Sequence, residues 1–338
     1  MKRFITLLAI LALTVLTGSE SLQAQPVKFA QAGMGFLKID VGARIAGMGG
    51  TQASTSGTAF DAFANPAGLA FVEGFDVMAN STSWIADISH YGLAAAYNAG
   101  GLGTFGINLV WMDYGTFRRT VPVDDLAGFA DLGSFTVSEF AIGISYARQI
   151  SDQFAIGGNI RYAEQDLGTV TIFDEVEGNN RDVGNSVDNF ILDFGTTYFT
   201  GFRDLRFGMS IRNFSNQSDY FNQRFELPLN FDFGVAMDLL QIPEAVEQNS
   251  ELTLAVDWQH PRDFSERLHA GVEYGFMKTF YVRTGYKFNY DEEGFTAGLG
   301  INYDVSAVGT IRADYAYADF GEFFDAVHRI TIGFKIGE

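Results

Sequence analysis

Alternation of apolar and polar or small residues is the feature that most constrains this chain. In the segment FAIGISYA, the large side chains belong to Phe140, Ile142, Ile144 and Tyr146, with small residues between them. A period of two indicates a β-strand with two different faces, because successive side chains point to opposite sides. The pattern recurs from residue 75 to the end of the chain. It predicts fourteen strands, near residues 75–84, 88–98, 103–113, 134–148, 153–164, 188–199, 204–213, 227–239, 250–260, 266–276, 279–289, 293–303, 308–318 and 327–337.

The lengths of these segments and of their connections indicate strands that cross a bilayer. A tilted transmembrane strand needs roughly 9–11 residues, and bacterial single-chain barrels have an even number of strands. The two longest connections, 114–133 and 165–187, follow odd-numbered strands, as the extracellular loops of outer-membrane barrels do. We therefore predict an all-β chain in which residues 73–338 form a 14-stranded antiparallel transmembrane β-barrel, located in the bacterial outer membrane and surrounded by its lipid.

Polar and charged residues recur on the strand face opposite the apolar one. Unpaired charges against lipid are costly, so these side chains are expected to point into the lumen. Their mixed signs predict a bonded network, which is either a set of structural salt bridges, the interpretation that we favour, or a path for a substrate. The residues are Asn159, Arg161, Asp193, Arg206, Arg212, Asp232, Asp257, Glu273, Arg283, Arg312 and Asp314.

The first 24 residues have the pattern of a secretory signal peptide. Lys2 and Arg3 precede an apolar run from Phe4 to Leu16, and small and polar residues follow up to a cleavage site predicted after Ala24. The apolar run is shorter than the ~20 residues that a spanning helix requires. We therefore expect an exported protein whose mature chain begins at Gln25.

Residues 25–72 lack strand alternation and are rich in Gly, Ala, Ser and Thr. A lumen bounded by fourteen strands is too wide for its lining side chains to fill, since the diameter of a barrel grows with strand number. The Asn-Pro step at Asn65 favours a fixed turn. These features predict a compact plug inside the barrel.

Three short motifs within residues 34–70 give a resemblance to a known family. The stretches FLKIDVGARIAGMGG and ASTSGTAFDAFANPAGLA resemble the N-terminal signature of the PorV/PorQ family, a branch of the FadL-like outer-membrane barrels. The matching residues are Gly42, Ala43 and Arg44, then Met48, Gly49 and Gly50, and finally Asn65, Pro66 and Ala67.

The resemblance implies two alternative functions. PorV-type proteins are non-enzymatic parts of type IX protein secretion, so the implied partners are the translocon and the C-terminal domains of secreted proteins. FadL-like proteins take up hydrophobic small molecules through a plugged barrel. The N-terminal motifs favour the first function, and the second remains the alternative. In the first case, the loops 114–133 and 173–189 are the expected contacts with cargo.

Other kinds of chemistry find little support in the sequence. The net charge of −19 and the lack of a basic cluster argue against binding of nucleic acid. The segment GLGTFG (101–106) precedes a predicted strand, so we interpret it as a turn instead of a dinucleotide site. The acidic loop holds Asp174, Glu175, Glu177 and Asp182 without the spacing of an EF-hand, and we interpret it as a solvated loop. We predict no catalytic residue, no cofactor and no metal site.

Overall fold

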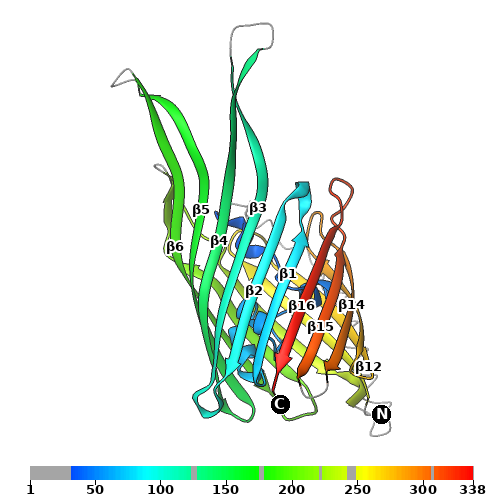
Figure 1. The fold of residues 1–338 in the computed structure, drawn as a ribbon. Helices are drawn as coiled ribbons and strands as arrows, with labels where there is room; N and C mark the ends of the chain where they lie inside the picture. Colours follow the sequence, from blue (N-terminus) through cyan, green and yellow to red (C-terminus); the bar gives the residue numbers. More distant parts are fainter. Residues whose placement is uncertain are drawn as a thin grey trace, which may run out of the picture.

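The computed structural model describes residues 32–122, 128–174, 179–220, 223–241, 249–305 and 308–337. The predicted signal peptide lies outside these residues. Within them, fourteen strands close into one antiparallel barrel, as predicted (Figure 1). Each strand pairs with its neighbours in the chain, and β1 closes the barrel against β16, with Phe75 opposite Ile336. The strands are β1 (Phe75–Ser83), β2 (Ser89–Asn98), β3 (Thr104–Pro122), β4 (Phe129–Ser151), β5 (Phe154–Asp174), β6 (Asn179–Phe199), β7 (Arg206–Ser215), β10 (Asn230–Asp238), β11 (Ser250–Pro261), β12 (Arg267–Phe276), β13 (Phe280–Phe288), β14 (Phe295–Val305), β15 (Gly309–Ala318) and β16 (Val327–Ile336).

Short elements occupy some of the connections. Strands β8 (Ser218–Tyr220) and β9 (Gln223–Phe225) form a separate two-stranded sheet, and 3₁₀ turns are found at η4 (Ile85–Asp87), η5 (Gly100–Leu102) and η6 (Leu239–Gln241). None of the helices in the described part of the chain is long and apolar enough to cross a membrane.

Two connections that we predicted as loops are largely strand, and this prediction was wrong. The pairing of β3 with β4 continues past Asp113 as far as Pro122, and that of β5 with β6 past Asp166 as far as Asp174. A register shift interrupts each ladder where a glycine with positive φ, Gly115 or Gly168, forms a bulge. Beyond the bulges, the regular alternation of apolar and polar residues is lost, because neither face of the hairpins borders the lumen. The result is two long hairpins that extend far past the rest of the barrel (Figure 1).

The barrel wall has an apolar outside and a small or polar inside. In β4, Ile142 and Ile144 are 51% and 64% exposed, whereas Ala141 and Ser145, which flank this pair, are buried. The alternation seen in the sequence therefore separates a lipid-facing surface from the lumen face.

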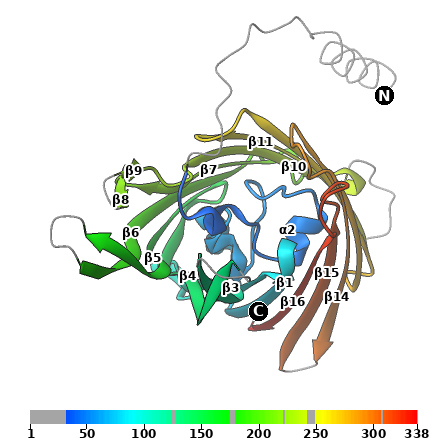
Figure 2. The same ribbon diagram turned by 90° about the horizontal axis from the view of Figure 1, so that it is seen from above.

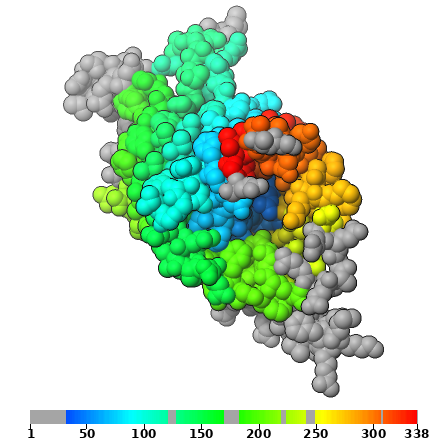
Figure 3. Space-filling model, turned by 60° about the horizontal axis from the view of Figure 1, so that its bottom comes forward, coloured from blue at the N-terminus to red at the C-terminus, as the bar shows by residue number. Residues whose placement is uncertain are grey.

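The N-terminal segment, residues 32–72, lies inside the barrel. Figure 2 shows its short helices within the ring of strands, and Figure 3 shows its atoms in the middle of that ring. The short helices of the segment are η1 (Gly35–Lys38), α2 (Ala43–Gly47), η2 (Ala59–Ala62) and η3 (Pro66–Phe71). Buried apolar residues of the segment, among them Phe36, Phe60 and Leu69, pack in one cluster with lumen-facing residues such as Ala94 and Val110. The segment therefore fills the lumen with turns and short helices. Its frequent glycines and Pro66 prevent longer helices.

Candidate functional site

A row of glycines on the lumen face lies against the N-terminal segment. Gly157 pairs with Gly195, Gly208 with Gly234, and Gly271 with Gly285 on neighbouring strands. A Cβ atom at Gly208 would lie 1.7 Å from the carbonyl oxygen of Ala53, so a side chain does not fit there. We call this row the glycine belt; its members are Gly157, Gly195, Gly208, Gly234, Gly271, Gly285 and Gly298. At five of these glycines the nearest atoms belong to the backbone of the segment, so the belt lets two backbones approach closely, which is the usual reason for glycine inside a strand. Gly195 instead leaves space for Asn65, and Gly234 for the side chains of Asp257 and Ala53.

Asn65 connects the N-terminal segment to the belt. Its Oδ1 accepts a hydrogen bond from the backbone N–H of Ala67 at 3.1 Å and so caps η3, which has Pro66 at its first position. Its Nδ2 donates to the carbonyl oxygens of Ala53 at 2.6 Å and Thr196 at 3.0 Å. The side chain therefore holds two parts of the segment and strand β6 together, and Gly195 leaves the space that it occupies.

The earlier motif around Arg44 is bound to the opposite side of the wall. Gly42 has a φ of +102°, and the N–H of Ala43 after it donates to Thr331 Oγ1 at 2.8 Å. Gly49 and Gly50 also have positive φ, and the N–H of Gly49 donates to Thr296 Oγ1 at 2.9 Å. These glycines provide turns that other residues adopt at a cost.

Arg44 starts a chain of charges that joins the segment to the wall. Its guanidinium binds Glu273 through two hydrogen bonds of 2.8 and 3.0 Å. Glu273 also forms an ion pair with Arg283, and Arg283 forms another with Asp314. We call these four residues the Glu273 cluster. Glu273 is 1% exposed and Arg283 is 4% exposed, whereas the side chain of Arg44 is 32% exposed, so the cluster is buried on the wall side and half-buried on the side of the segment.

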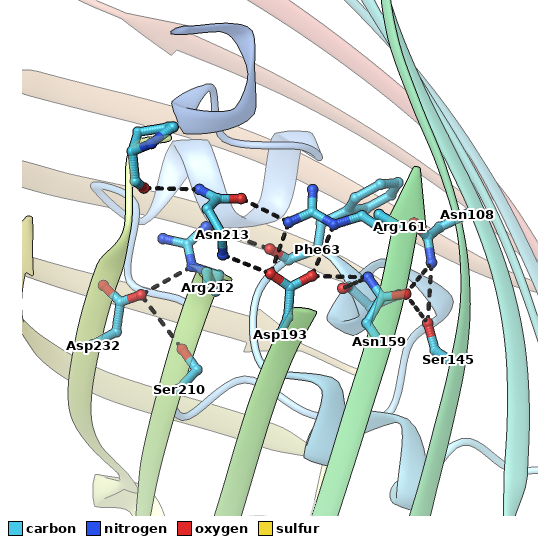
Figure 4. A network of polar contacts seen from close by, with 12 residues as sticks. Phe63, Asn108, Ser145, Asn159, Arg161, Asp193, Ser210, Arg212, Asn213 and Asp232 are labelled. Carbon is cyan, nitrogen blue, oxygen red and sulfur yellow. Dashed lines mark hydrogen bonds and ion pairs between the residues drawn. The ribbon is translucent and has the colours of Figure 1, made fainter. Parts of the chain in front are cut away.

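A second set of charges mainly joins strands to one another (Figure 4). Arg161 on β5 binds Asp193 on β6 through two hydrogen bonds of 2.8 Å and donates a third to Asn213 Oδ1 at 2.7 Å. Asn159 links Asp193 to the side chains of Asn108 and Ser145. We call these six residues the Arg161 cluster. One bond reaches the N-terminal segment, from Asn159 Nδ2 to the carbonyl oxygen of Ala62 at 3.1 Å.

The remaining predicted lumen residues form separate contacts with the wall or the segment. Arg212 pairs with Asp232 at 3.0 Å and donates to the carbonyl oxygen of Phe63 at 3.4 Å (Figure 4). Arg206 donates to the carbonyl oxygen of Ser54 at 2.8 Å. Two other residues were predicted with them. Arg312 pairs with Asp76, and Asp257 accepts hydrogen bonds from the backbone N–H groups of Gln52 and Ala53 at 2.6 and 2.7 Å.

Burial changes the acidity of carboxyl groups in the segment. Burial raises the pKa of Asp61 to about 6, despite the hydrogen bond that its carboxylate accepts from Thr58 N–H. Burial also acts to raise the pKa of Asp40, but the nearby Lys287 and Arg329 outweigh it and hold that pKa far below its usual range. The charge of Glu273 raises the pKa of Arg44, which keeps this guanidinium charged.

Several buried residues of the lumen escaped the sequence reasoning. Arg329 stands at a lumen position, alternating with the lipid-facing Ile330 and Ile332, so its place in the pattern could have revealed it. The glycine belt follows the same parity. In contrast, Asp40 and the partners of Asn65 had no signal, because the path of an irregular segment sets their positions.

A metal site is not formed by the described residues, among which no group of three or more His, Asp or Glu side chains comes together. The four acidic residues considered for calcium (Asp174, Glu175, Glu177 and Asp182) have side chains outside the described part of the chain.

A comparison with protein-family models identifies the chain. The model of the type IX secretion system membrane protein PorP/SprF matches residues 130–334, which is more than half of the 338 residues. The protein belongs to the PorP/SprF family. The PorV/PorQ branch that the N-terminal motifs indicated is not confirmed, and the PorP/SprF match lies entirely outside those motifs. No curated protein matches the chain.

Solved structures similar to this PorP/SprF family member share its fold at low sequence identity. The toluene transporter TbuX of Ralstonia pickettii is 12% identical with a TM-score of 0.55, and the match covers 87% of this chain and 98% of TbuX. The toluene transporter TodX of Pseudomonas putida is 10% identical with a TM-score of 0.56, with 92% and 100% covered. A FadL homologue of Pseudomonas aeruginosa is 9% identical with a TM-score of 0.56, with 87% and 98% covered. The fold is therefore that of the FadL-like barrels.

Proposed function

We propose that this protein is a non-catalytic outer-membrane component of type IX secretion that receives secreted cargo on its two long hairpins. Membership in the PorP/SprF family supports a role in this system. We further propose that the N-terminal segment is a permanent plug, so that cargo contacts the outside of the barrel and does not pass through its lumen.

The observation that carries this proposal is the length of the hairpins. Strand β2 pairs with β3 only as far as Asp113, opposite Ser89, so the rest of β3 has no partner in β2. The nine residues that follow Asp113, up to Pro122, reach about 30 Å beyond that point, at ~3.3 Å per residue. A barrel that only crosses the bilayer has no need for such extensions, since its other strands of 9–12 residues already suffice.

The hairpin of β3 and β4 carries apolar side chains that neither lipid nor the lumen covers. Phe117 and Phe135 stack at 5.5 Å between ring centroids and are 42% and 39% exposed, and Leu132 is 55% exposed. Exposed apolar groups next to paired strands favour contact with a protein partner.

The contacts of the N-terminal segment support the plug. Asn65, the Glu273 cluster and the glycine belt hold it from several sides of the wall. Passage of a folded domain through the lumen would require breaking all of these contacts together.

Shortened hairpins test the proposal. Residues 114–137 and 167–185 are each replaced by Asn-Gly, which closes the ladders after the pairs Asp113–Ser138 and Asp166–Ser186 with a hairpin turn. We expect the barrel to insert normally, as judged by heat-modifiable migration, while secreted proteins no longer co-purify with it from outer membranes. Undiminished recovery of secreted proteins would reject the hairpins as the receiving surface.

Uptake of hydrophobic small molecules is a second candidate, and one observation favours it. An apolar hollow of about 540 Å³ lies in the outer wall among Ile156, Phe194 and Ile211. Its floor includes Gly157 and Gly195, which contact the plug on their lumen side. Toluene entry into proteoliposomes would test this function, with Gly158→Phe, which fills the hollow, as the matched variant. Faster toluene entry with the wild-type protein than with Gly158→Phe would favour uptake. Equally slow entry with both proteins would reject it.

A further inference from the structure

We propose that a second cavity, on the lumen side, binds a phosphate group between Arg267 and Arg329. The cavity has a volume of about 210 Å³ and lies between the N-terminal segment and the ends of β12, β13 and β16. Its walls include Asp40 of the segment and Lys287 and Tyr290 of the barrel. It opens at the end of the barrel from which the hairpins project. This inference is independent of the proposed role in secretion.

Arg329 is a buried cation that has no bonded partner within the described part of the chain. The residue is 1% exposed, and its Nε has no hydrogen-bond partner. Among the described residues, its recorded contacts are the ring of Trp84, 5.5 Å from the guanidinium carbon to the ring centroid, and through-space attraction to Asp40 and Glu293. A buried charge that lacks a bonded partner is strongly unfavourable in a folded protein. A bound anion would remove this penalty.

Arg267 is held in place by stacking instead of by an ion pair. Its guanidinium carbon lies 4.2 Å from the ring centroid of Phe264 and 3.9 Å from that of Tyr290. Its Nε is also buried without a partner. The two rings fix the plane of the guanidinium, which leaves its edge free to donate hydrogen bonds.

The carboxylates that line the cavity are already engaged by lysines. Lys287 Nζ lies 2.9 Å from Asp40 and 2.6 Å from Glu293, and Lys38 Nζ lies 2.8 Å from Asp263. These pairs leave the charges of the two arginines without a carboxylate bonded to either. The cavity therefore offers two guanidinium groups to an incoming anion.

A phosphate group matches this arrangement in charge and in donor geometry. A phosphate monoester carries about −1.5 to −2 charges at pH 7. It is attracted by the cavity because the two arginines and two lysines exceed the three carboxylates by one positive charge. Guanidinium edges bind phosphate oxygens through paired hydrogen bonds. The phosphate can come from free inorganic phosphate or from the headgroup of an anionic lipid, and the experiment separates these sources.

Calorimetric titration of the full-length protein in detergent tests the site. Inorganic phosphate and the soluble lipid dihexanoyl phosphatidic acid are the two probes. We expect saturable binding of one equivalent, weakened roughly tenfold to a hundredfold in Arg329→Gln and Arg267→Gln. Arg148→Gln is the control, because Arg148 is exposed at the other end of the barrel. Tighter binding of the lipid than of phosphate would identify a headgroup site, and equal binding a site for the free anion.

Two outcomes would overturn the proposal. One is the lack of saturable binding of either probe to folded wild-type barrel. The other is binding that both arginine variants retain at full strength, which would place the anion elsewhere. If Arg329→Gln does not insert into the membrane, Arg267→Gln still decides the matter, since Arg267 is only half-buried and forms no ion pair with any residue that the structure describes.

Discussion

The Arg161 cluster and the Glu273 cluster are both built around a buried carboxylate, yet they join different parts of the molecule. The Arg161 cluster connects the side chains of strands β3 to β7 to one another. The Glu273 cluster binds the wall to Arg44 of the N-terminal segment. Similar charges therefore perform two tasks in one lumen: one set stabilises the barrel, and the other seats the segment inside it. Variants of each cluster should separate these tasks.

The largest loss of stability is expected when the Arg161 cluster is disrupted. Asp193→Ala leaves Arg161 buried without its carboxylate, and removing one partner of a buried ion pair costs about 3–5 kcal/mol. The free energy of barrel unfolding in urea should fall by that amount. Asp152→Ala, at an exposed turn, is the control and should change little. A loss below about 1 kcal/mol for Asp193→Ala would show that the cluster does not stabilise the wall.

A smaller and more local effect is expected from the Glu273 cluster. Glu273→Ala removes the carboxylate that binds both Arg44 and Arg283, while Asp314 still pairs with Arg283. Because Arg283 keeps Asp314 and the side chain of Arg44 is 32% exposed, the loss should stay within about 1.5–3 kcal/mol, the contribution of one hydrogen bond to a charged group. We expect faster proteolysis within residues 32–72 and a barrel that keeps most of its resistance to urea. Equal losses in the segment and in the barrel would erase the distinction between the clusters.

Side-chain volume added to the glycine belt should loosen the N-terminal segment. Gly208→Ala places a methyl group against the carbonyl of Ala53, and overpacking of this kind costs typically about 1–3 kcal/mol. The segment should become more accessible to protease without any change in charge. Gly158→Ala is a matched control on β5, because a Cβ there has only ordinary contacts, the nearest at 3.6 Å. Identical protease resistance of the two variants would argue against close backbone contact at the belt.

The smallest expected effect is a pH dependence of the stability of the N-terminal segment. Asp61 has a pKa raised to about 6 from 3.8, so the fold favours its protonated form. The stabilisation is therefore complete below pH 3.8 and is lost as the pH rises through 6. Protease accessibility of the segment should increase between pH 4.5 and 7, and Asp61→Asn should flatten this profile. A flat profile in the wild-type protein would contradict the assignment.

The two parts of the molecule also differ in how far the sequence predicts them. The predicted strand positions agree with the structure to within a few residues for β10 to β16, because one face meets lipid and the other meets the lumen. The predicted strands ended too early in β3 and β5 and began too late in β4 and β6, because the strands continue past the barrel and that two-sided environment ends.

In the barrel wall, the candidate site was predictable where it shares the parity of the strands, and in the N-terminal segment only the motif residues themselves were. Arg161 and Glu273 stand out as charges within apolar strands, and the structure places both on the lumen face. The contact of Asn65 with Thr196 bridges 131 residues and depends on the path of an irregular segment. No local pattern encodes such a path, so the partners of the motif could not be derived from it.

Photo-crosslinking in living cells tests the central proposal most directly. A benzoylphenylalanine placed at Phe117, on the hairpin of β3 and β4, should crosslink to secreted proteins of the type IX system. The same group at Ile142, on the lipid-facing wall, should not. Crosslinks to secreted proteins from position 117 alone would support reception of cargo by the hairpins. No crosslink from position 117 during active secretion would contradict it.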